Sequence, residues 1–358
     1  MKKVREGSAE IFIYQGKISK ELPVFYNPVM KLNRDITILL LKQFKPIKLC
    51  DPLAGTGIRA IRFAKELKYK SIVANDNSKG AVTLIRKNMK HNKVKFEVKN
   101  KDASIMLLES KGFDFIDLDV FGSPNFVLDA SVKRISRNGI LAVTATDTAC
   151  LSGTFPKTCL RKYWAIPLRN EIMHEIGLRI LIRKIQLIAA QYDKALMPIF
   201  SYAKEHYMRV FFKCIKGKQK VDTILKRHGM FNEAGPLWLG NLWDKALVNK
   251  MYKDTNEKIL LRKINSLVYK VKKNNREITN FINNEKFLKI IKNEAKIPVV
   301  GFFDIHKLAK KYKFKSIPKK ELLIKKIKEK YKASETHFSP QGIKSDIPEK
   351  ELLKIFNQ

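Results

Sequence analysis

The sequence predicts an α/β fold in which a doubly wound, mostly parallel sheet is followed by a smaller basic α+β domain. Between residue 47 and about residue 215, short apolar runs alternate with amphipathic segments of helical length. This alternation is typical of right-handed βαβ crossovers and therefore of a parallel sheet. Beyond about residue 216 the composition becomes rich in lysine, which indicates a second domain.

Five parallel strands are expected in the first part of the chain, at residues 47–51, 70–76, 95–100, 113–119 and 139–146. The segments between them, such as 57–67 and 79–91, have the apolar spacing of helices. Residues 152–169 contain a glycine and two prolines and are predicted to form a loop. A long helix is expected from about residue 170 to residue 192.

Two further strands are expected to pair antiparallel. The apolar runs 197–204 and 207–215 lie too close together for a crossover helix, which favours a hairpin at the edge of the sheet. Five parallel strands completed by such a hairpin are typical of class I methyltransferases, whereas a dinucleotide-binding domain would continue in parallel.

The C-terminal part is predicted to contain two helices, at residues 304–314 and 317–331, followed by a loop at 334–346. This order resembles a winged helix, a common nucleic-acid-binding module. The alternative is that these charged amphipathic helices are solvated surface elements.

The net charge points to a polyanionic partner. Lys and Arg number 72 against 34 Asp and Glu, a formal net charge of +38. Nucleic acid is the expected partner of so basic a chain, although a lysine-biased composition is an alternative explanation. Neither a long apolar run nor a signal-peptide pattern is present, so we expect a cytoplasmic protein with no membrane partner. The four cysteines form no Cys-x-x-Cys pair, which argues against a disulfide framework or a zinc ribbon.

A glycine-containing turn follows the first predicted strand, in residues 51–57, "DPLAGTG". Gly55 and Gly57 allow the backbone to turn tightly and to approach a ligand. Asp76 ends the second strand, where a carboxylate can bind ribose hydroxyls, and Asp102 with Ala103 follows the third, where it can receive an adenine amino group. Ala60 replaces the third glycine of a pyrophosphate fingerprint, so S-adenosylmethionine is favoured over NAD or FAD; a degenerate, empty pocket is the remaining alternative.

Two carboxylates and an aromatic ring end the fourth predicted strand, in residues 117–124, "DLDVFGSP". Ligands of open α/β sheets bind at this carboxyl edge. An aromatic amine is a poor nucleophile, and a carboxylate that accepts its N–H bonds can orient the lone pair and take up developing positive charge. Asp119 suits that role and Phe121 suits stacking on a base. Asp117 is an alternative acceptor, and a helix cap is an alternative role for Asp119.

Taken together, the motifs resemble those of the tRNA guanine-26 N2-dimethyltransferase family. They include "VFYNPVMKLNRD", "DPLAGTGIRAIR", "NDNS", "DLDVFGSP", "TDTACLSGTFPKTCLRKYWAIPLRNEIMHEIGLRIL", "HYMRV", "GPLWLGNLWD" and "THFSPQGIKSD", and they span nearly the whole chain. The resemblance implies a class I S-adenosylmethionine fold in residues 1–230, with an N-terminal extension, and a basic tRNA-binding domain in residues 231–358. It implies two successive methyl transfers to the exocyclic N2 of guanine 26 of tRNA.

Position by position, the resemblance also implies roles for single residues. It places Arg34 and Arg59 near the methionine carboxylate, Asp76 on the ribose, and Asp102 with Ala103 at the adenine. It makes Asp119 the catalytic carboxylate, with Phe25 and Phe121 flanking the guanine.

The chain departs from the family's pattern in two places. Val120 stands where the family's turn usually has proline, which predicts a less preorganised loop. The segment before "GPLWLG" contains no cysteine, so we expect no metal. Two other functions stay open: an amino-methyltransferase of another RNA or DNA base, and a non-catalytic RNA-binding relic.

Three further motifs have competing interpretations. Glu171, His174 and Glu175 have a helical spacing that could present a metal, but a structural helix is the simpler expectation. Residues 157–164, "KTCLRKYW", are either a lid that contacts RNA phosphate or a basic surface loop. Trp238 and Trp243 are expected to pack between domains instead of stacking on bases.

Overall fold

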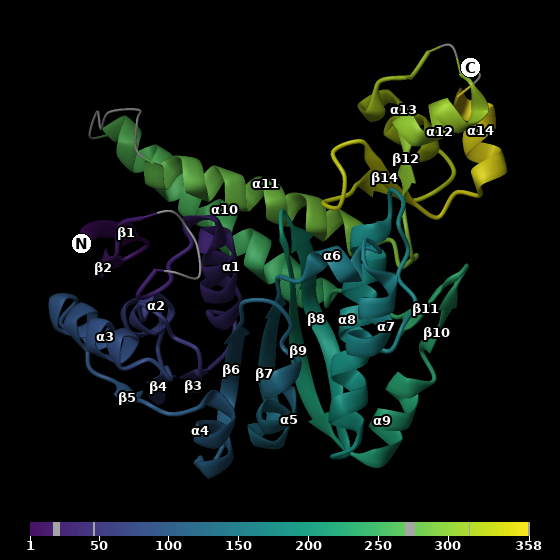
Figure 1. The fold of residues 1–358 in the computed structure, drawn as a ribbon. Helices are drawn as coiled ribbons and strands as arrows, with labels where there is room; N and C mark the ends of the chain where they lie inside the picture. The colour runs from purple at the N-terminus through teal and green to yellow at the C-terminus, as the bar shows by residue number, and fades with distance from the viewer. Residues whose placement is uncertain (17–21, 46, 269–275, 315, 357–358) are drawn as a thin grey trace.

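A seven-stranded sheet organises the molecule (Figure 1). The computed structural model describes residues 1–16, 22–45, 47–268, 276–314 and 316–356. The strand order is β5-β4-β3-β6-β7-β9-β8, and the five strands from β3 to β7 are parallel to one another. Their bounds are β3 (Lys48–Asp51), β4 (Ser71–Asn75), β5 (Glu97–Lys99), β6 (Phe113–Asp119) and β7 (Ile135–Ala145). The predicted parallel sheet is therefore confirmed.

The predicted antiparallel hairpin is also present, as β8 (Lys194–Lys204) and β9 (Tyr207–Lys216). β9 lies inside the sheet, between β7 and β8, and β8 forms the edge. The register pairs Thr144 of β7 with Arg209 of β9, which brings that arginine beside the end of β6. This order agrees with the class I methyltransferase fold.

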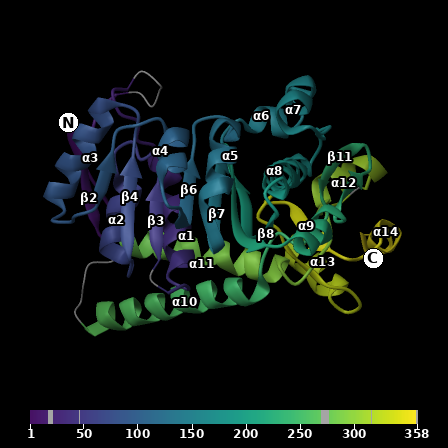
Figure 2. The same ribbon diagram turned by 90° about the horizontal axis from the view of Figure 1, so that it is seen from below.

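Helices cover both faces of the sheet, which explains why its central strands are nearly continuous apolar runs. Phe115 and Ile116 of β6 are fully buried, and each such side chain contributes roughly 1.5–3 kcal/mol. In Figure 2, α5 and α8 lie on one side of the central strands and α1, α10 and α11 on the other. These and the remaining helices around the sheet are α1 (Lys31–Leu41), α2 (Ile58–Glu66), α3 (Lys79–His91), α4 (Ala103–Glu109), α5 (Asn125–Arg134), α8 (Met173–Ala190), α10 (Lys245–Val268) and α11 (Arg276–Glu294).

An N-terminal hairpin, which the sequence analysis did not predict, precedes the sheet domain. Its strands are β1 (Lys2–Glu6) and β2 (Ala9–Ile13). Ile11 is fully buried in a small cluster with Ile58 and Ile61 of α2. A short 3-10 helix, η1 (Pro28–Met30), then leads into α1. The hairpin brings Glu6 into the interior, which matters for the site below.

The loop predicted over residues 152–169 is partly helical, so that prediction is wrong. After α6 (Thr148–Leu151), helix α7 (Pro156–Tyr163) begins with proline in its first turn, a position where the missing N–H costs nothing. Cys159 and Tyr163, one helical turn apart, are buried and anchor α7 to the domain. The predicted helix at 170–192 is α8, slightly shorter at both ends.

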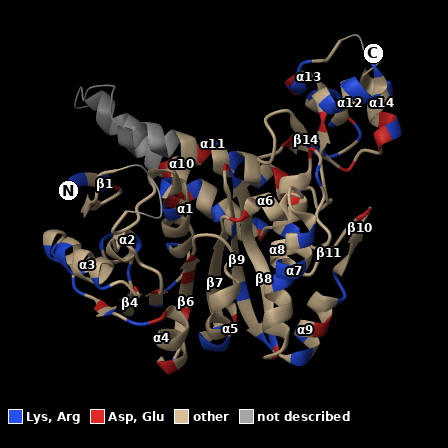
Figure 3. Ribbon diagram, viewed as in Figure 1, with Lys and Arg blue, Asp and Glu red and all other residues tan. Residues whose placement is uncertain are grey.

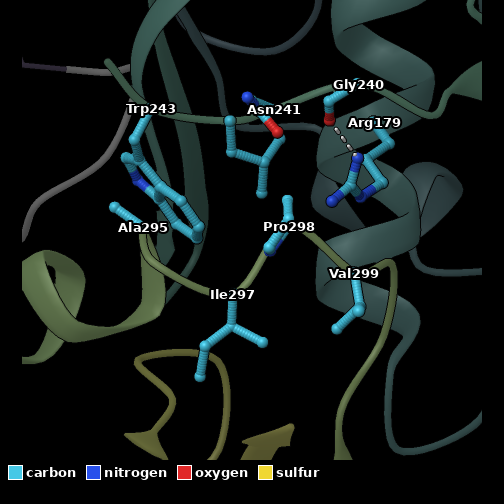
Figure 4. Close-up of a pocket in the computed structure, with 9 residues that line it drawn as sticks. Arg179, Gly240, Asn241, Trp243, Ala295, Ile297, Pro298 and Val299 are labelled. Carbon is cyan, nitrogen blue, oxygen red and sulfur yellow. Dashed lines mark hydrogen bonds between the residues drawn. The ribbon is translucent and has the colours of Figure 1, made fainter. Parts of the chain in front are cut away.

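The segment between β9 and α11 comprises α9 (Lys218–Leu225), the hairpin β10 (His228–Phe231) with β11 (Ala234–Trp238), and α10. Of these, α9 and β11 pack on α8, whereas α10 packs against α1 and α11 on the other side of the sheet. Trp238 and Trp243 are buried, and the indole N–H of Trp243 donates to the carbonyl of Ser201 at 2.8 Å, which confirms their packing role. A crevice of about 10 Å³ lies beside Trp243, and its size suits one water molecule at most. Figure 4 shows residues that line it, among them Arg179, which donates to the carbonyl of Gly240.

The C-terminal residues form a winged-helix module with its own core. Its elements are β12 (Phe303–Asp304), α12 (Ile305–Tyr312), α13 (Lys320–Ile327), β13 (Ala333–Glu335), β14 (Gly342–Ser345) and α14 (Glu349–Phe356). The strand order is β12-β14-β13. The loop expected over 334–346 is thus incorrect in part, because β14 and most of β13 lie within it. Buried apolar side chains of residues 234–251 and 288–302, by contrast, pack in the same hydrophobic cluster as the sheet.

A buried ion pair joins this module to α8. Lys344 of β14 donates to both carboxylate oxygens of Glu175 at 2.8 Å, and neither side chain is exposed. Arg179 bonds to the same carboxylate. Burial opposes ionisation of Glu175, but the charges of Lys344 and Arg179 outweigh it and lower its pKa to about 2. Glu175 therefore has a structural role, in agreement with the expectation that residues 171–175 belong to a structural helix.

Within the described ranges, no helix is both long and apolar enough to span a membrane.

Candidate active site

A cavity of about 710 Å³ opens at the carboxyl ends of β3, β4 and β6. This is the edge at which open α/β sheets bind ligands. Seven of the ten predicted site residues line it: Phe25, Arg34, Gly55, Arg59, Asp76, Asp119 and Phe121. The other three, Gly57, Asp102 and Ala103, lie outside its wall.

The glycine turn has the backbone that its sequence requires. Gly55 and Gly57 have φ values of +52° and +77°, which side chains with a Cβ rarely adopt. A Cβ on Gly57 would lie 3.1 Å from Ile85, so this glycine serves the packing of α2 against α3. The amide of Gly55 donates to the carboxylate of Asp76 at 2.9 Å, which ties the turn to the end of β4.

The end of β4 organises the neighbouring loops through a residue that sequence reasoning missed. Asn75 is fully buried and donates to the carbonyls of Pro52 (3.0 Å) and Lys101 (2.9 Å). It thereby joins the loop after β3 to the loop before α4. Asp102 caps α4 by accepting the amides of Ser104 and Ile105, so its carboxylate is engaged at the helix start.

The two carboxylates of "DLDVFGSP" have different surroundings. Asp119 lines the cavity with 19% of its side chain exposed, whereas Asp117 is fully buried. Asp117 accepts two hydrogen bonds from Arg209, at 2.7 and 2.8 Å, and one from Arg59 at 3.0 Å. Asp117 is therefore not the alternative acceptor that the sequence allowed, because its charge is compensated inside the sheet.

Arg59 connects the buried carboxylate to the one in the cavity. Its guanidinium forms ion pairs with both Asp117 and Asp119 and donates to Asn33 at 3.1 Å. Burial alone would raise the pKa of Asp119, but Arg59, Arg209 and Arg34 outweigh it and lower that pKa below its usual value. Asp119 is thus held ionised and in a fixed orientation.

A second arginine of the cavity wall is bound by the N-terminal hairpin. Arg34 makes two hydrogen bonds of 2.7 Å to the carboxylate of Glu6, which also accepts from Arg62 at 2.9 Å. Burial opposes ionisation of Glu6, but the two arginines outweigh it and lower its pKa to about 2. Sequence reasoning missed Glu6; the alternating residues on either side of Gly7-Ser8 were the available signal for its hairpin.

Two aromatic rings lie at the rim of the cavity. Phe25 and Phe121 are 36% and 62% exposed, and their ring centroids are 5.9 Å apart in an edge-to-face arrangement. Val120, in place of the family's proline, is buried and lines the cavity. Gly122, two residues after Val120, exchanges two hydrogen bonds with Thr146, which holds the loop.

The wall also contains a carboxylate oxygen that has no partner. Asp51 is 2% exposed, and its Oδ2 makes no hydrogen bond. Burial raises the pKa of Asp51 to about 8, although the charge of Arg59 opposes the shift. A buried, unsatisfied acceptor in a cavity fits a ligand that brings a cation or donor, and the ammonium group of S-adenosylmethionine is such a donor. The residues present therefore fit this cofactor.

Within the described part of the chain, no group of three or more His, Cys, Asp or Glu side chains is placed to hold a metal ion.

Comparison with known proteins gives concordant results. The sequence profile described as N2,N2-dimethylguanosine tRNA methyltransferase matches residues 3–232 and 226–357. The tRNA (guanine(26)-N(2)/guanine(27)-N(2))-dimethyltransferase of Aquifex aeolicus is 35% identical over 99% of this chain and 95% of its own length. The tRNA (guanine(26)-N(2))-dimethyltransferase of Pyrococcus abyssi is 36% identical over 99% of this chain and 98% of its own.

Among solved structures, Trm1 from Pyrococcus horikoshii in complex with S-adenosyl-L-methionine superposes with a TM-score of 0.87. It is 35% identical, and the match covers 99% of both chains. The whole fold is thus shared, the winged-helix module included. This chain belongs to the N2,N2-dimethylguanosine tRNA methyltransferase family.

Proposed function

We propose that this protein transfers methyl groups from S-adenosylmethionine to the exocyclic N2 of guanine 26 in tRNA, giving N2-methylguanosine and then N2,N2-dimethylguanosine. The observation that carries the proposal is the position of Asp119. It is an ionised carboxylate at the rim of a cofactor-sized cavity, next to an exposed phenylalanine, in a chain that matches the N2-dimethyltransferases from end to end.

S-adenosylmethionine supplies an electrophilic methyl group on its sulfonium sulfur. We assign the ribose to Asp76 and the close approach of the backbone to Gly55 and Gly57. The adenine is assigned to Asp102 with Ala103, although neither lines the cavity, because both amides that Asp102 caps bond to its Oδ1, which leaves Oδ2 to accept the adenine amino group. Asp51, with its unpaired oxygen, is suited to the ammonium group.

Arg34 and Arg59 are assigned to the methionine carboxylate. Each guanidinium is already bonded to carboxylates of the chain, Arg34 to Glu6 and Arg59 to Asp117 and Asp119. Either arginine would therefore share its donors between these groups and the cofactor, which arginine's five N–H groups permit.

Asp119 is proposed to act on the attacking amine. The lone pair of guanine N2 is delocalised into the ring, and a carboxylate that accepts the N–H bonds orients it toward the methyl carbon. As the N–C bond forms and the C–S bond breaks, positive charge develops on N2 and the amine proton passes to Asp119. The lowered pKa of Asp119 keeps it ionised before the reaction.

The guanine must leave its base stack to reach this position. Phe25 and Phe121 are placed at the entrance to receive it. Because the two rings now contact each other, a base that stacks between them must first separate them.

The basic C-terminal region, residues 231–358, is proposed to bind tRNA through its shape and phosphates. Figure 3 shows Lys and Arg along α12 and α13 of the winged-helix module. A substrate of this class is consistent with a cytoplasmic enzyme.

One assay separates the candidate functions. The protein is incubated with labelled S-adenosylmethionine and an unmodified tRNA transcript, and the products are identified by nucleoside mass spectrometry. We expect N2-methylated guanosines, and no product from a matched transcript with adenine at position 26. N6-methyladenosine would instead indicate an amino-methyltransferase of another base, and tRNA binding without any labelling would indicate a non-catalytic relic.

A further inference from the structure

Helix α7 and the residues on either side of it, Phe155 and Trp164, form an exposed surface that the proposed mechanism does not use. Large apolar side chains are more than 40% exposed here: Phe155 (57%), Leu160 (55%) and Trp164 (46%). Lys157 and Arg161, on the same short helix, are exposed as well. An aromatic ring next to cations is the combination that nucleic-acid strands favour, because phosphates and base faces occur together on them.

This surface is bonded directly to the catalytic loop. The hydroxyl of Tyr163 donates to the carboxylate of Asp147 at 2.6 Å and lies 3.1 Å from the hydroxyl of Ser123. The side-chain amide of Asn125 donates to the carbonyl of Lys162 at 2.9 Å. Ser123 and Asn125 follow Phe121 within four residues, so α7 lies beside the entrance to the site.

Trp164 ends α7 and is held by two basic residues of α8. Its φ is +56°, the left-handed conformation in which the helix terminates. Arg183 donates to its carbonyl at 3.1 Å, and the ammonium of Lys184 lies 2.8 Å from the centroid of its ring. One face of the indole is thus covered by Lys184, while nearly half of the residue remains open to solvent.

Charge decides which partner this surface fits. In the described part of the chain, no ion pair to a carboxylate engages Lys157 or Arg161. Lys162 does pair with Asp147, at 3.5 Å, so its charge is already compensated within the protein. Figure 2 places α7 on the opposite side of the sheet from α10 and α11.

We propose that α7 and Trp164 are a second tRNA-contact surface, at which Lys157 and Arg161 bind backbone phosphates next to the extracted guanine and the indole of Trp164 contacts the same strand. The proposal rests on the proposed function, since it takes tRNA as the substrate. It adds a contact within the methyltransferase domain to the one assigned to residues 231–358.

The test uses the full-length protein and measures tRNA binding at several salt concentrations. The double variant Lys157→Ala, Arg161→Ala is compared with Lys218→Ala, Lys220→Ala, which removes two exposed lysines from α9 at the far end of the sheet (Figure 1). We expect the α7 variant to bind tRNA about tenfold more weakly. Its plot of log affinity against log salt should lose roughly 1.4–1.8 of slope, the effect of two phosphate contacts. The α9 variant should bind as the wild type does.

A third variant isolates the indole. Trp164→Asn removes the ring but tolerates the left-handed backbone. It should weaken tRNA binding without changing the salt slope, because a ring carries no charge. Calorimetric affinity for S-adenosylmethionine and the melting temperature should remain those of the wild type in all three variants.

The outcomes separate this proposal from the proposed function. If the α7 variant keeps wild-type affinity and slope while the wild type methylates guanine 26, the α7 surface is wrong and the function stands. An equal loss in both double variants also overturns it, because the effect would be one of net charge. If the wild type binds tRNA without methylating it, the function fails, and loss of binding in the α7 variant alone would still support the contact.

Discussion

The guanidinium of Arg209 in β9 makes two hydrogen bonds, of 2.7 and 2.8 Å, to the carboxylate of Asp117 in β6, and neither side chain is exposed. The two strands are not neighbours, because β7 lies between them. The pair fixes Asp117, Asp117 holds Arg59, and Arg59 holds Asp119. The orientation of the proposed catalytic carboxylate thus depends on an ion pair inside the sheet.

Arg209→Met should destabilise the protein strongly. It leaves Asp117 buried with a single cationic partner, and breaking a buried pair typically costs about 3–5 kcal/mol. The free energy of unfolding, measured with urea, is the readout. Lys133→Met is the control, because the Lys133–Asp129 pair is exposed and should contribute under about 1 kcal/mol. Equal effects of the two substitutions would contradict the role given to Arg209.

Asp119→Asn should lower kcat for tRNA methylation by about 100-fold or more, since the amide cannot accept the amine proton. Affinity for S-adenosylmethionine, measured by calorimetry, should change little, because Arg59 keeps its bond to Asp117. Near-wild-type turnover in this variant would show that another group activates the amine.

Phe121→Ala should weaken the productive binding of tRNA. Stacking on an aromatic ring contributes about 1–3 kcal/mol per base, so kcat/KM for tRNA should fall by about 5- to 150-fold. Tyr69→Ala is a suitable control, because Tyr69 is 37% exposed and lies before β4, at the opposite end of the strand from the cavity. A comparable loss in both variants would argue against a stacking role for Phe121.

The raised pKa of Asp51 predicts that the stability of the cofactor-free protein depends on pH. Its pKa is raised from 3.8 to about 8 by burial, so the folded state retains a proton that the unfolded state releases. The free energy of unfolding should therefore fall as pH rises from about 4 to about 8 and level off above that. Asp51→Asn should reduce this fall. Urea titrations of both proteins between about pH 5 and pH 9 provide the comparison. An unchanged pH profile would mean that Asp51 is ionised in the folded protein.

The buried pair between Lys344 and Glu175 should position the winged-helix module. Lys344→Met is expected to cost about 3 kcal/mol, the lower end for a broken buried pair, because Arg179 still bonds to Glu175. It should also raise the KM for tRNA. Lys354→Met, which removes an exposed pair with Glu351 in the same module, should do neither. Unfolding and steady-state kinetics together test this prediction.

Much of the fold was predictable because its signals are local. The strands around residues 50, 73 and 116 and the helices between them have periodic apolar patterns that neighbouring residues alone determine. Helix α7 was missed because Gly153, Pro156 and Pro167 dominate its surroundings, whereas its helical character depends on burying Cys159 and Tyr163 against α6 and α8. Strands β13 and β14 were missed because three- and four-residue strands carry almost no periodicity.

The sequence by itself determined which residues follow each strand at the carboxyl edge, and so placed Gly55, Asp76, Asp119 and Phe121 around one cavity. Only the tertiary structure decided which of Asp117 and Asp119 faces that cavity. It also decided which carboxylates of the chain form ion pairs with Arg34 and Arg59. The reason is physical: Glu6, Asn33 and Arg209 come from a hairpin, a helix and a strand far apart in the chain. The charges of Arg59, Arg209 and Arg34 lower the pKa of Asp119 only once folding has brought these side chains together and removed water from between them.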